Sequence, residues 1–525
     1  MFLRPLYVSV FAIVAVSLAC RAASSMDRLR VEHGRIVDAA GRTVVLHGMN
    51  VGEKSSSKGH RLWQGQEDFQ NLHRWGMNAV RLLIFWSAIE PEPGRYDEDY
   101  LKLVDQYVAW AKNSDLYVIL DMHQDLFSEK IPGGNGMPAW ATLDDGQPHR
   151  TVGHIWSTAY YVSPMVHRVF DNLYANATGP DGVGIQERFA QAWQHVARRY
   201  AEESAVAGFD LINEPFIGSD VTKMGLALLV ALPGVFQDTK FPTEPGALLD
   251  SLSGSGGPLP SWVLNGLDDP ACHRRALDVI APFMRDFETG RLMPMYNRIT
   301  RAIRDGNSDG IIFLEPCVLA NVGTPSFLEP LADRQGNRDP QQAYMPHFYD
   351  ITVDTELAWE PSANRLRVIM ENRAAEAKRL AMPLLIGEWG GYYGSSRAKN
   401  AARAALKELL PNTVGDFYWD YQRGLDQTVY FEVFSRPLPG MINGTIERME
   451  LDLDRQVFAC SWRENARRVE TRFFVPHAWG GSGYAWQTET GRGEPIGDAI
   501  EGTTVAVPPE RPGEMRTLTI SLKKP

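Results

Sequence analysis

The sequence predicts an α/β protein: a (β/α)8 TIM barrel followed by a C-terminal all-β sandwich domain. Three observations indicate this fold. Strand-like apolar runs alternate with amphipathic helical stretches over most of the 525 residues. Most of these runs are apolar on both faces until their last residues, as is typical of parallel strands covered by helices. Past about residue 435, short strands between Gly and Pro turns replace that alternation.

Eight apolar runs are expected to form the barrel strands. In chain order they cover residues 43–50, 78–85, 116–123, 208–214, 310–315, 343–349, 383–389 and 415–421. The stretches 100–111 and 185–200 repeat apolar residues with helical spacing and are expected to be barrel helices. Eight strand–helix units favour closure into a barrel.

The predicted domains are a leader over residues 1–25, a catalytic barrel over 26–434 and a β-sandwich over 435–525. Within the barrel, the long segment 216–304 separates the fourth and fifth strands and predicts a helical apolar insertion at the C-terminal rim. Its apolar run is too short to span a membrane. Short strands at 472–475, 503–507 and 516–522 indicate the sandwich.

The first 25 residues are typical of a secretory signal peptide. Arg4 precedes an apolar stretch over residues 6–19, and small residues follow. We therefore expect a protein that is secreted or resides in the cell envelope. Cys20 leaves lipoprotein anchoring open, although Ser17 stands where such sites prefer leucine.

Composition excludes several classes of function. The formal net charge is -11, so the basic surface that nucleic-acid binding needs is missing. After the leader only Cys272, Cys317 and Cys460 remain, which is too few for a disulfide scaffold and leaves room for one bridge. The chain has no CxxC or HExxH motif, and we expect no metal and no organic cofactor.

Two carboxylates at strand ends point to glycoside hydrolysis. Glu214 follows Asn213 at the end of the fourth strand, and Glu388 ends the seventh. In TIM barrels the chemistry takes place at the carboxyl ends of the strands. A pair of carboxylates facing one cleft can serve as the proton donor and the nucleophile. We expect Glu214 to be the acid, because its apolar strand raises its pKa, and Glu388 to be the nucleophile, kept ionised by Arg81.

Further polar side chains gather at the same predicted rim. His123 and Asp125 follow the third strand, His347 and Tyr349 share one face of the sixth, and Trp419 ends the eighth. An aromatic ring at such a position can stack on a sugar, with core packing as the alternative. Glu315 ends the fifth strand with a similar local sequence, and a structural or rim role is expected for it.

These motifs together resemble glycoside hydrolase family 5 of clan A over roughly residues 30–430. The resemblance implies a retaining double displacement in which Asn213 holds a sugar 2-hydroxyl and Tyr349 contacts the nucleophile. Within the family, the stretches 48–58, 121–125, 134–140 and 210–215 resemble endoglycoceramidases. That implies a glycosphingolipid substrate, cleavage between the glycan and ceramide, and sugar contacts from Asp125 and a lysine of the loop at Lys54.

The apolar insertion gains a role under this resemblance. Its side chains could line a lipid groove or touch a membrane surface, and the alternative is a helix buried against the barrel. The lipid-facing candidates are Leu228, Leu229, Leu232 and Phe236. Two rival functions stay open: a relative that cleaves another β-glucoside (glucosylceramide, a steryl glucoside or a β-glucan), and a non-catalytic binding barrel, which the paired glutamates argue against.

Overall fold

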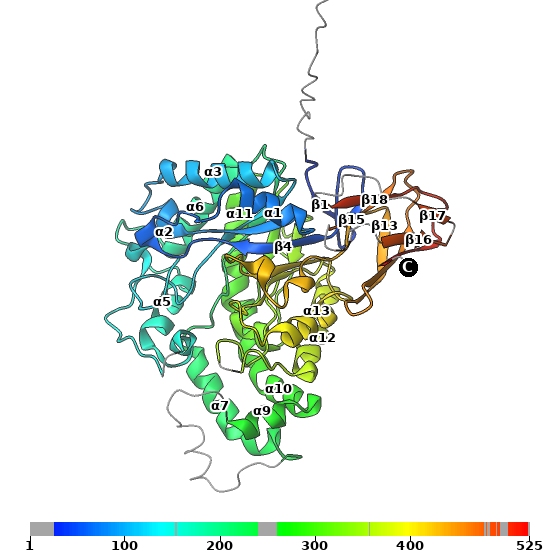
Figure 1. Ribbon diagram of the computed structural model, residues 1–525. Coiled ribbons are helices and arrows are strands. Elements are labelled where there is room, and N and C mark those ends of the chain that lie inside the picture. Colours follow the sequence, from blue (N-terminus) through cyan, green and yellow to red (C-terminus); the bar gives the residue numbers. More distant parts are fainter. Residues whose placement is uncertain are drawn as a thin grey trace, which may run out of the picture.

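The computed structural model describes residues 26–152, 155–239, 260–355, 357–476, 479, 484–489, 491–493 and 502–522. The predicted leader and the Gly-rich stretch 251–258 lie outside these residues. A barrel surrounded by helices is followed by a smaller β domain that lies beside it (Figure 1). In the described chain, no helix has the length and apolarity needed to cross a bilayer.

Eight parallel strands form the barrel, as predicted. In the sheet they follow the order β10-β11-β4-β5-β6-β7-β8-β9. Parallel bridges from Tyr344 to Leu384 and from Phe348 to Trp389 join the two outer strands and close the barrel. The strands are β4 Leu46–Val51, β5 Ala79–Ile84, β6 Tyr117–Met122, β7 Val206–Asp210, β8 Ile311–Leu314, β9 Gln342–Tyr344, β10 Ile386–Gly390 and β11 Gly415–Trp419.

Amphipathic helices cover the outside of the barrel. Asp97 caps the start of α3 by accepting hydrogen bonds from the backbone amides of Asp99 and Tyr100, both at 3.0 Å. The helices around the barrel are α1 Gln66–Arg74, α2 Trp86–Ile89, α3 Glu98–Lys112, α4 Ala159–Val162, α5 Pro164–Tyr174, α6 Ile185–Arg199, α11 Met293–Arg304, α12 Ala363–Leu380 and α13 Lys399–Leu409. Short 3-10 helices lie in the loops at η1 Ser56–Lys58, η2 Ala139–Ala141, η3 Trp156–Thr158, η5 Val318–Val322, η6 Leu425–Gln427 and η7 Phe431–Val433.

The described parts of the long segment between β7 and β8 are largely helical, and these helices project from one end of the barrel (Figure 1). It contains α7 Asp220–Val235, α9 Ser261–Leu267, α10 Pro270–Phe287 and the π-helical turn η4 Glu288–Leu292. Leu232 and Phe236 are buried in a small core with residues of α9 and α10, whereas Leu229 is 42% exposed. The lipid-facing candidates thus divide between the two faces of α7.

The C-terminal domain consists of two antiparallel sheets with a shared core that includes Phe458, Trp462, Phe473 and Leu518. One sheet has the order β1-β2-β3-β12-β15-β18, so the first three strands of the chain belong to it, which the sequence did not predict. The strands of this first sheet are β1 Arg30–Glu32, β2 Arg35–Val37, β3 Thr43–Val44, β12 Leu438–Ile442, β15 Thr471–Val475 and β18 Thr503–Val507. Those of the second sheet are β13 Gly444–Asp452, β14 Val457–Glu464, β19 Met515–Leu522, β16 Tyr484–Thr488 and β17 Gly491–Gly493.

The cysteines of the described chain form no disulfide with one another. Cys272, Cys317 and Cys460 are all buried free thiols.

Candidate active site

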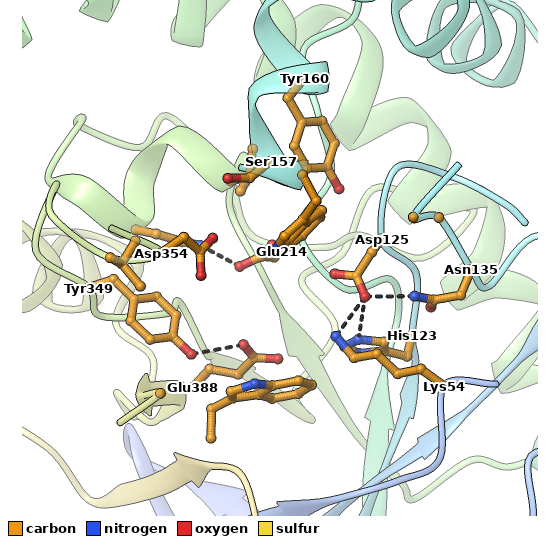
Figure 2. A pocket seen from close by; sticks show the side chains of 18 of the residues that line it. Lys54, His123, Asp125, Asn135, Ser157, Tyr160, Glu214, Tyr349, Asp354 and Glu388 are labelled. Carbon is orange, nitrogen blue, oxygen red and sulfur yellow. Dashed lines mark hydrogen bonds and ion pairs between the residues drawn. The ribbon is translucent and has the colours of Figure 1, made fainter. Parts of the chain in front are cut away.

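The carboxyl ends of the barrel strands surround a cavity of about 680 Å³. Glu214 and Glu388 face this cavity from opposite sides, and the hydroxyl of Tyr349 points to Glu388 (Figure 2). The other predicted residues at its wall are Lys54, His123, Asp125 and Trp419. Arg81, Asn213 and His347 are almost fully buried beneath the wall, where Arg81 contacts Glu388 and His347 contacts Glu214.

The backbone at the end of β7 turns Glu214 toward the cavity. Glu214 has a φ of 47°, a left-handed conformation that is uncommon for residues other than glycine. Its amide donates a hydrogen bond to the buried Glu315 carboxylate at 2.9 Å. Asn213 is fixed as well, since its Oδ1 accepts from Arg81 and its Nδ2 donates to the carbonyl of Gln124, both at 3.0 Å. A strand that is apolar elsewhere can therefore end on a carboxylate that reaches the cavity.

Two donors orient the Glu214 carboxylate. Its Oε1 accepts a hydrogen bond from Asn321 Nδ2 at 2.6 Å, and it contacts His347 Nδ1 at 2.9 Å. Asn321 belongs to η5, in the loop after β8, and the sequence reasoning missed it. The carbonyl of Asn321 also accepts from the amide of Tyr349 at 3.0 Å. One residue therefore contacts both Glu214 and the segment that carries the tyrosine beside Glu388.

Glu388 lies between two donors of its own. Arg81 Nη1 is 2.8 Å from its Oε1, and the Tyr349 hydroxyl is 3.1 Å from its Oε2. Burial raises the pKa of Glu388 to about 7; His347 and Arg81 oppose this shift, and the charge of Glu214 adds to it. Arg81 thus favours the ionised form of Glu388, as expected, but burial and the charge of Glu214 outweigh it and the pKa is raised.

Arg81 is shared among four carboxylates, which explains why it does not outweigh the burial of Glu388. It pairs with Asp121, Asp210, Glu315 and Glu388 at 2.7–3.0 Å. Burial disfavours the charged guanidinium, but these partners raise its pKa well above the usual value. Burial raises the pKa of Asp210 well above its usual value, with Glu315 adding to the shift. The guanidinium therefore neutralises the floor of the site as a whole.

His347 links the two candidate catalytic carboxylates. Its Nδ1 is 2.9 Å from Glu214 Oε1 and 3.4 Å from Glu388 Oε2, while Nε2 is 3.2 Å from Glu315. Burial disfavours the imidazolium, yet these carboxylates raise its pKa well above the ordinary range. One ligand atom each of Glu214, His347 and Glu388 lie within 4.8 Å of one another. Carboxyl groups this close match a retaining glycosidase, because an inverting one needs room for a water molecule.

Two groups in the described chain have the composition and spacing of a metal site. They are Glu214, His347 and Glu388, and the deeper set Asp121, Asp210 and Glu315. A protein cation already lies among the oxygens of each: His347 in the first group and Arg81 in the second. Proton transfer among these side chains is therefore the chemistry that the arrangement supports directly.

A second set of polar residues lies on one side of the cavity (Figure 2). Asp125 accepts from Lys54 at 2.6 Å and from Asn135 at 2.7 Å. Burial disfavours its charge, but Lys54 and His123 lower the pKa of Asp125 far below its usual range. His123 stacks on Trp419 at 5.4 Å, and the Lys54 ammonium lies 4.2 Å from the same indole ring. These groups can bind sugar hydroxyls and one sugar face.

An apolar cavity of about 460 Å³ adjoins the catalytic one. Tyr161 and Val322 belong to the walls of both. Most of its other apolar residues come from α7, α10 and η5, among them Val221, Met224, Leu228, Leu277, Ile280 and Leu319. Of the four lipid-facing candidates, Leu228 lies at this wall, whereas Leu229, Leu232 and Phe236 do not.

Comparisons with known proteins agree with this geometry. The family described as "Cellulase (glycosyl hydrolase family 5)" matches residues 37–232 and 270–424. The Endoglycoceramidase I of Rhodococcus hoagii is 26% identical over 486 residues, covering 90% of this chain and 84% of that protein. The Endoglycoceramidase of Hydra vulgaris is 29% identical over 215 residues, which is 36% of this chain and 40% of the relative's own length.

Solved structures of an endo-glycoceramidase are also similar to this chain in fold and sequence. The endo-glycoceramidase II of Rhodococcus sp., as a complex with a cellobiose-like imidazole, has a TM-score of 0.70 and 26% identity, over 92% of this chain and 98% of that one. A structure of the same protein described as a lactosyl-enzyme intermediate has a TM-score of 0.69 and 26% identity, over 93% and 99% of the two chains.

Proposed function

This chain belongs to glycosyl hydrolase family 5, and from that premise we propose that it is a retaining endo-β-glycosidase that cleaves between the glycan and the ceramide of glycosphingolipids. That it is a glycoside hydrolase follows from the family. The finer assignment rests on the polarity of the connected cavities, which are polar at Lys54 and Asp125 and apolar beyond Tyr161 and Val322. A glycolipid has the same gradient around the bond to be cut.

In the first step Glu388 attacks the anomeric carbon of the sugar next to the lipid. Glu214 donates its proton to the ceramide oxygen, which leaves as the alcohol. Arg81 contacts Oε1 of Glu388 and Tyr349 contacts Oε2, so the oxygen that bonds to the sugar and the carbonyl oxygen of the resulting glycosyl ester each keep one donor beside them. We propose that Asn213, which lies next to Glu214 beneath the cavity wall, holds the 2-hydroxyl of the reacting sugar.

In the second step Glu214 acts as the base. It removes a proton from water, the water oxygen attacks the anomeric carbon, and the ester bond to Glu388 breaks. Both displacements invert the carbon, so the released glycan keeps its configuration. The short distance between the carboxylates supports this mechanism, since the nucleophile and the acid must reach one bond together.

The apolar cavity is the proposed site of the alkyl chains. Leu228 on α7 lines this cavity. We expect Leu228→Asp to lower kcat/KM for a glycosphingolipid by ~10-fold or more, because a charged side chain is costly in an apolar cavity. The matched control is a soluble aryl lactoside, which has no alkyl chain and should lose far less. Equal losses on both substrates would argue against a lipid role for this cavity.

The opposite face of α7 is proposed to touch the surface on which the substrate lies. Leu226, Leu229 and Val230 are 62%, 42% and 75% exposed there. Leu229→Asp should slow the cleavage of glycolipid in vesicles and leave the cleavage of the same lipid dispersed in detergent unchanged.

We also propose that the predicted leader directs the protein to the cell envelope or outside the cell. A substrate that lies in membranes agrees with such export.

Product analysis tests the proposed function. The protein is incubated with lactosylceramide in detergent and, in parallel, with a soluble β-glucan, and Glu388→Gln serves as the blank. Intact disaccharide together with ceramide is the expected result. Release of monosaccharide only would indicate a glucosylceramidase-like activity, and glucan fragments with untouched glycolipid would indicate a β-glucan hydrolase.

A further inference from the structure

A polar pocket of about 260 Å³ adjoins the catalytic cavity. Three consecutive serines at 55–57 line it, together with His60, Ser87 and Glu129. It shares Lys54, Ser55, Gly134 and Asn135 with the catalytic cavity. The stretch 48–58 thus contributes residues to two adjoining sites.

This polar pocket lies at the end of the site where the glycan belongs. The residues it shares with the catalytic cavity include Lys54 and Asn135, whereas the apolar cavity joins at Tyr161 and Val322. Figure 2 shows Lys54 and Asn135 on the side of the cavity away from Tyr349. A chain of sugars that leads away from the lipid therefore passes Lys54 and Asp125 before it reaches this pocket.

The pocket offers the hydrogen-bonding groups that a sugar requires. Ser55 Oγ and Ser57 Oγ lie 2.7 Å apart and can each donate or accept. Asn135 is only 8% exposed, and its Oδ1 has no partner although its Nδ2 donates to Asp125. A buried acceptor left unpaired is costly, so a ligand hydroxyl that donates to it would be favoured.

His60 adds a further acceptor. Its Nδ1 lies 3.0 Å from the carbonyl of Glu53, to which it donates, and its ring stacks on Phe85 with centroids 4.1 Å apart. Burial lowers the pKa of His60, which keeps the ring neutral and makes Nε2 an acceptor. The stacking and the backbone contact fix the orientation of the ring, which lines the pocket.

The charges of the pocket disfavour an anionic ligand. Glu129 is the carboxylate among its lining residues, and its partner is the hydroxyl of Ser56. Lys54 is committed to Asp125 at 2.6 Å, and the nearby Lys58 pairs with Glu53 at 2.7 Å. Among the described residues that line the pocket, Lys54 and Glu129 are the charged side chains, so a sialic acid here would meet the Glu129 carboxylate while the Lys54 ammonium is paired with Asp125.

We propose that this pocket binds the third sugar of the glycan, counted from the lipid, and that it selects an uncharged sugar over an acidic one. The inference rests on the proposed function only for the direction of the glycan. Ser55, Ser57, His60 and Asn135 bind the hydroxyls of the sugar, and Glu129 excludes sialic acid from the position.

Calorimetric binding of free sugars to the Glu388→Gln protein tests the proposal without a lipid. The ligands are lactose, two neutral trisaccharides that extend it (globotriose and lacto-N-triose) and 3′-sialyllactose. At least one neutral trisaccharide is expected to bind ~10-fold more tightly than lactose, since one or two net hydrogen bonds are gained. Sialyllactose should show no gain over lactose.

Two further variants locate the effect. On the Glu388→Gln background, Ser57→Trp should remove the advantage of the trisaccharide, and Glu129→Gln should narrow the gap between sialyllactose and the neutral trisaccharide. Ser308→Trp, an exposed serine three residues before β8 at the other end of the barrel, is the matched control.

The proposal is overturned if neither neutral trisaccharide binds more tightly than lactose, if no sugar binds measurably, or if the gain survives Ser57→Trp. Sialyllactose that binds as tightly as a neutral trisaccharide would overturn the charge selection. Because the ligands carry no ceramide, these results are separate from the product analysis, which alone decides whether glycolipid is cleaved.

Discussion

Removal of the Asn321 amide should separate the two steps of the reaction. Asn321→Ala deletes the 2.6 Å hydrogen bond to Glu214 and leaves the backbone carbonyl that holds the segment of Tyr349. A hydrogen bond to a charged group contributes about 1.5–3 kcal/mol, which corresponds to a rate factor of roughly 10 to 150. The loss should appear wherever Glu214 has to transfer a proton.

The assay compares a glycosphingolipid with a lactoside that carries a good leaving group, such as 4-nitrophenol. For the glycolipid, kcat/KM should fall ~10-fold to ~100-fold, because the leaving alcohol needs the proton of Glu214. For the aryl lactoside, kcat/KM should change less than ~3-fold, since nitrophenolate leaves without help. Its kcat should nevertheless fall if hydrolysis of the ester limits turnover, because Glu214 is then the base.

Asn372→Ala is the matched control. Its amide donates to the carbonyl of Gly323 at 2.8 Å and so supports the same loop without touching Glu214. Equal losses of kcat/KM on both substrates in Asn321→Ala, matched by Asn372→Ala, would refute the reasoning and assign Asn321 to loop stability. Unchanged kinetics on both substrates would refute it as well.

Four further predictions concern the site and the barrel. Glu388→Gln should lower kcat by ~10³-fold or more on both substrates, because no covalent step remains, and turnover near that of the unchanged protein would contradict the assignment. Since burial raises the pKa of Glu388 to about 7, kcat/KM should fall as the pH drops below about 7, where the nucleophile becomes protonated. Glu214→Gln removes a charge that raises this pKa, so the acid limb measured with the aryl lactoside should move to lower pH; an unmoved limb would show that the two carboxyls are not coupled. Gly208→Ala would place a Cβ 1.9 Å from the carbonyl oxygen of Ile311, and the free energy of unfolding should fall by ~1–3 kcal/mol or more in a denaturant titration; an unchanged midpoint would contradict the close strand packing.

Much of the barrel and of the candidate catalytic pair could be predicted from the sequence. Apolar runs such as 116–123 and 208–214 indicate buried parallel strands. Because such strands are buried on both faces, they are apolar throughout and lack the alternation of apolar and polar residues that a half-exposed strand has. The polar residue at the end of such a run is then placed at one rim by the topology alone. For this reason Glu214 and Glu388 could be paired although they are 174 positions apart in the chain.

Other features depended on contacts that no local pattern encodes. Strands β1 to β3 have only two or three residues each, too few for periodicity, and their place in the C-terminal sheet depends on pairing with distant strands. Asn321 lies in a 3-10 helix without a motif, and its role arises because β7 and β8 are neighbours. A polar residue soon after a strand end is the one signal that could have suggested it.

Burial and charge sharing were decided by the tertiary structure. α7 is apolar on all sides, so hydrophobic spacing could not tell which face packs; the partner helices α9 and α10 placed Leu232 and Phe236 inside and left Leu229 outside. The sequence likewise predicted Arg81 as the partner of Glu388. How far that pairing lowers the pKa depends on the other three carboxylates around the same guanidinium, because the electrostatic balance is set by distances in space, which positions along the chain do not determine.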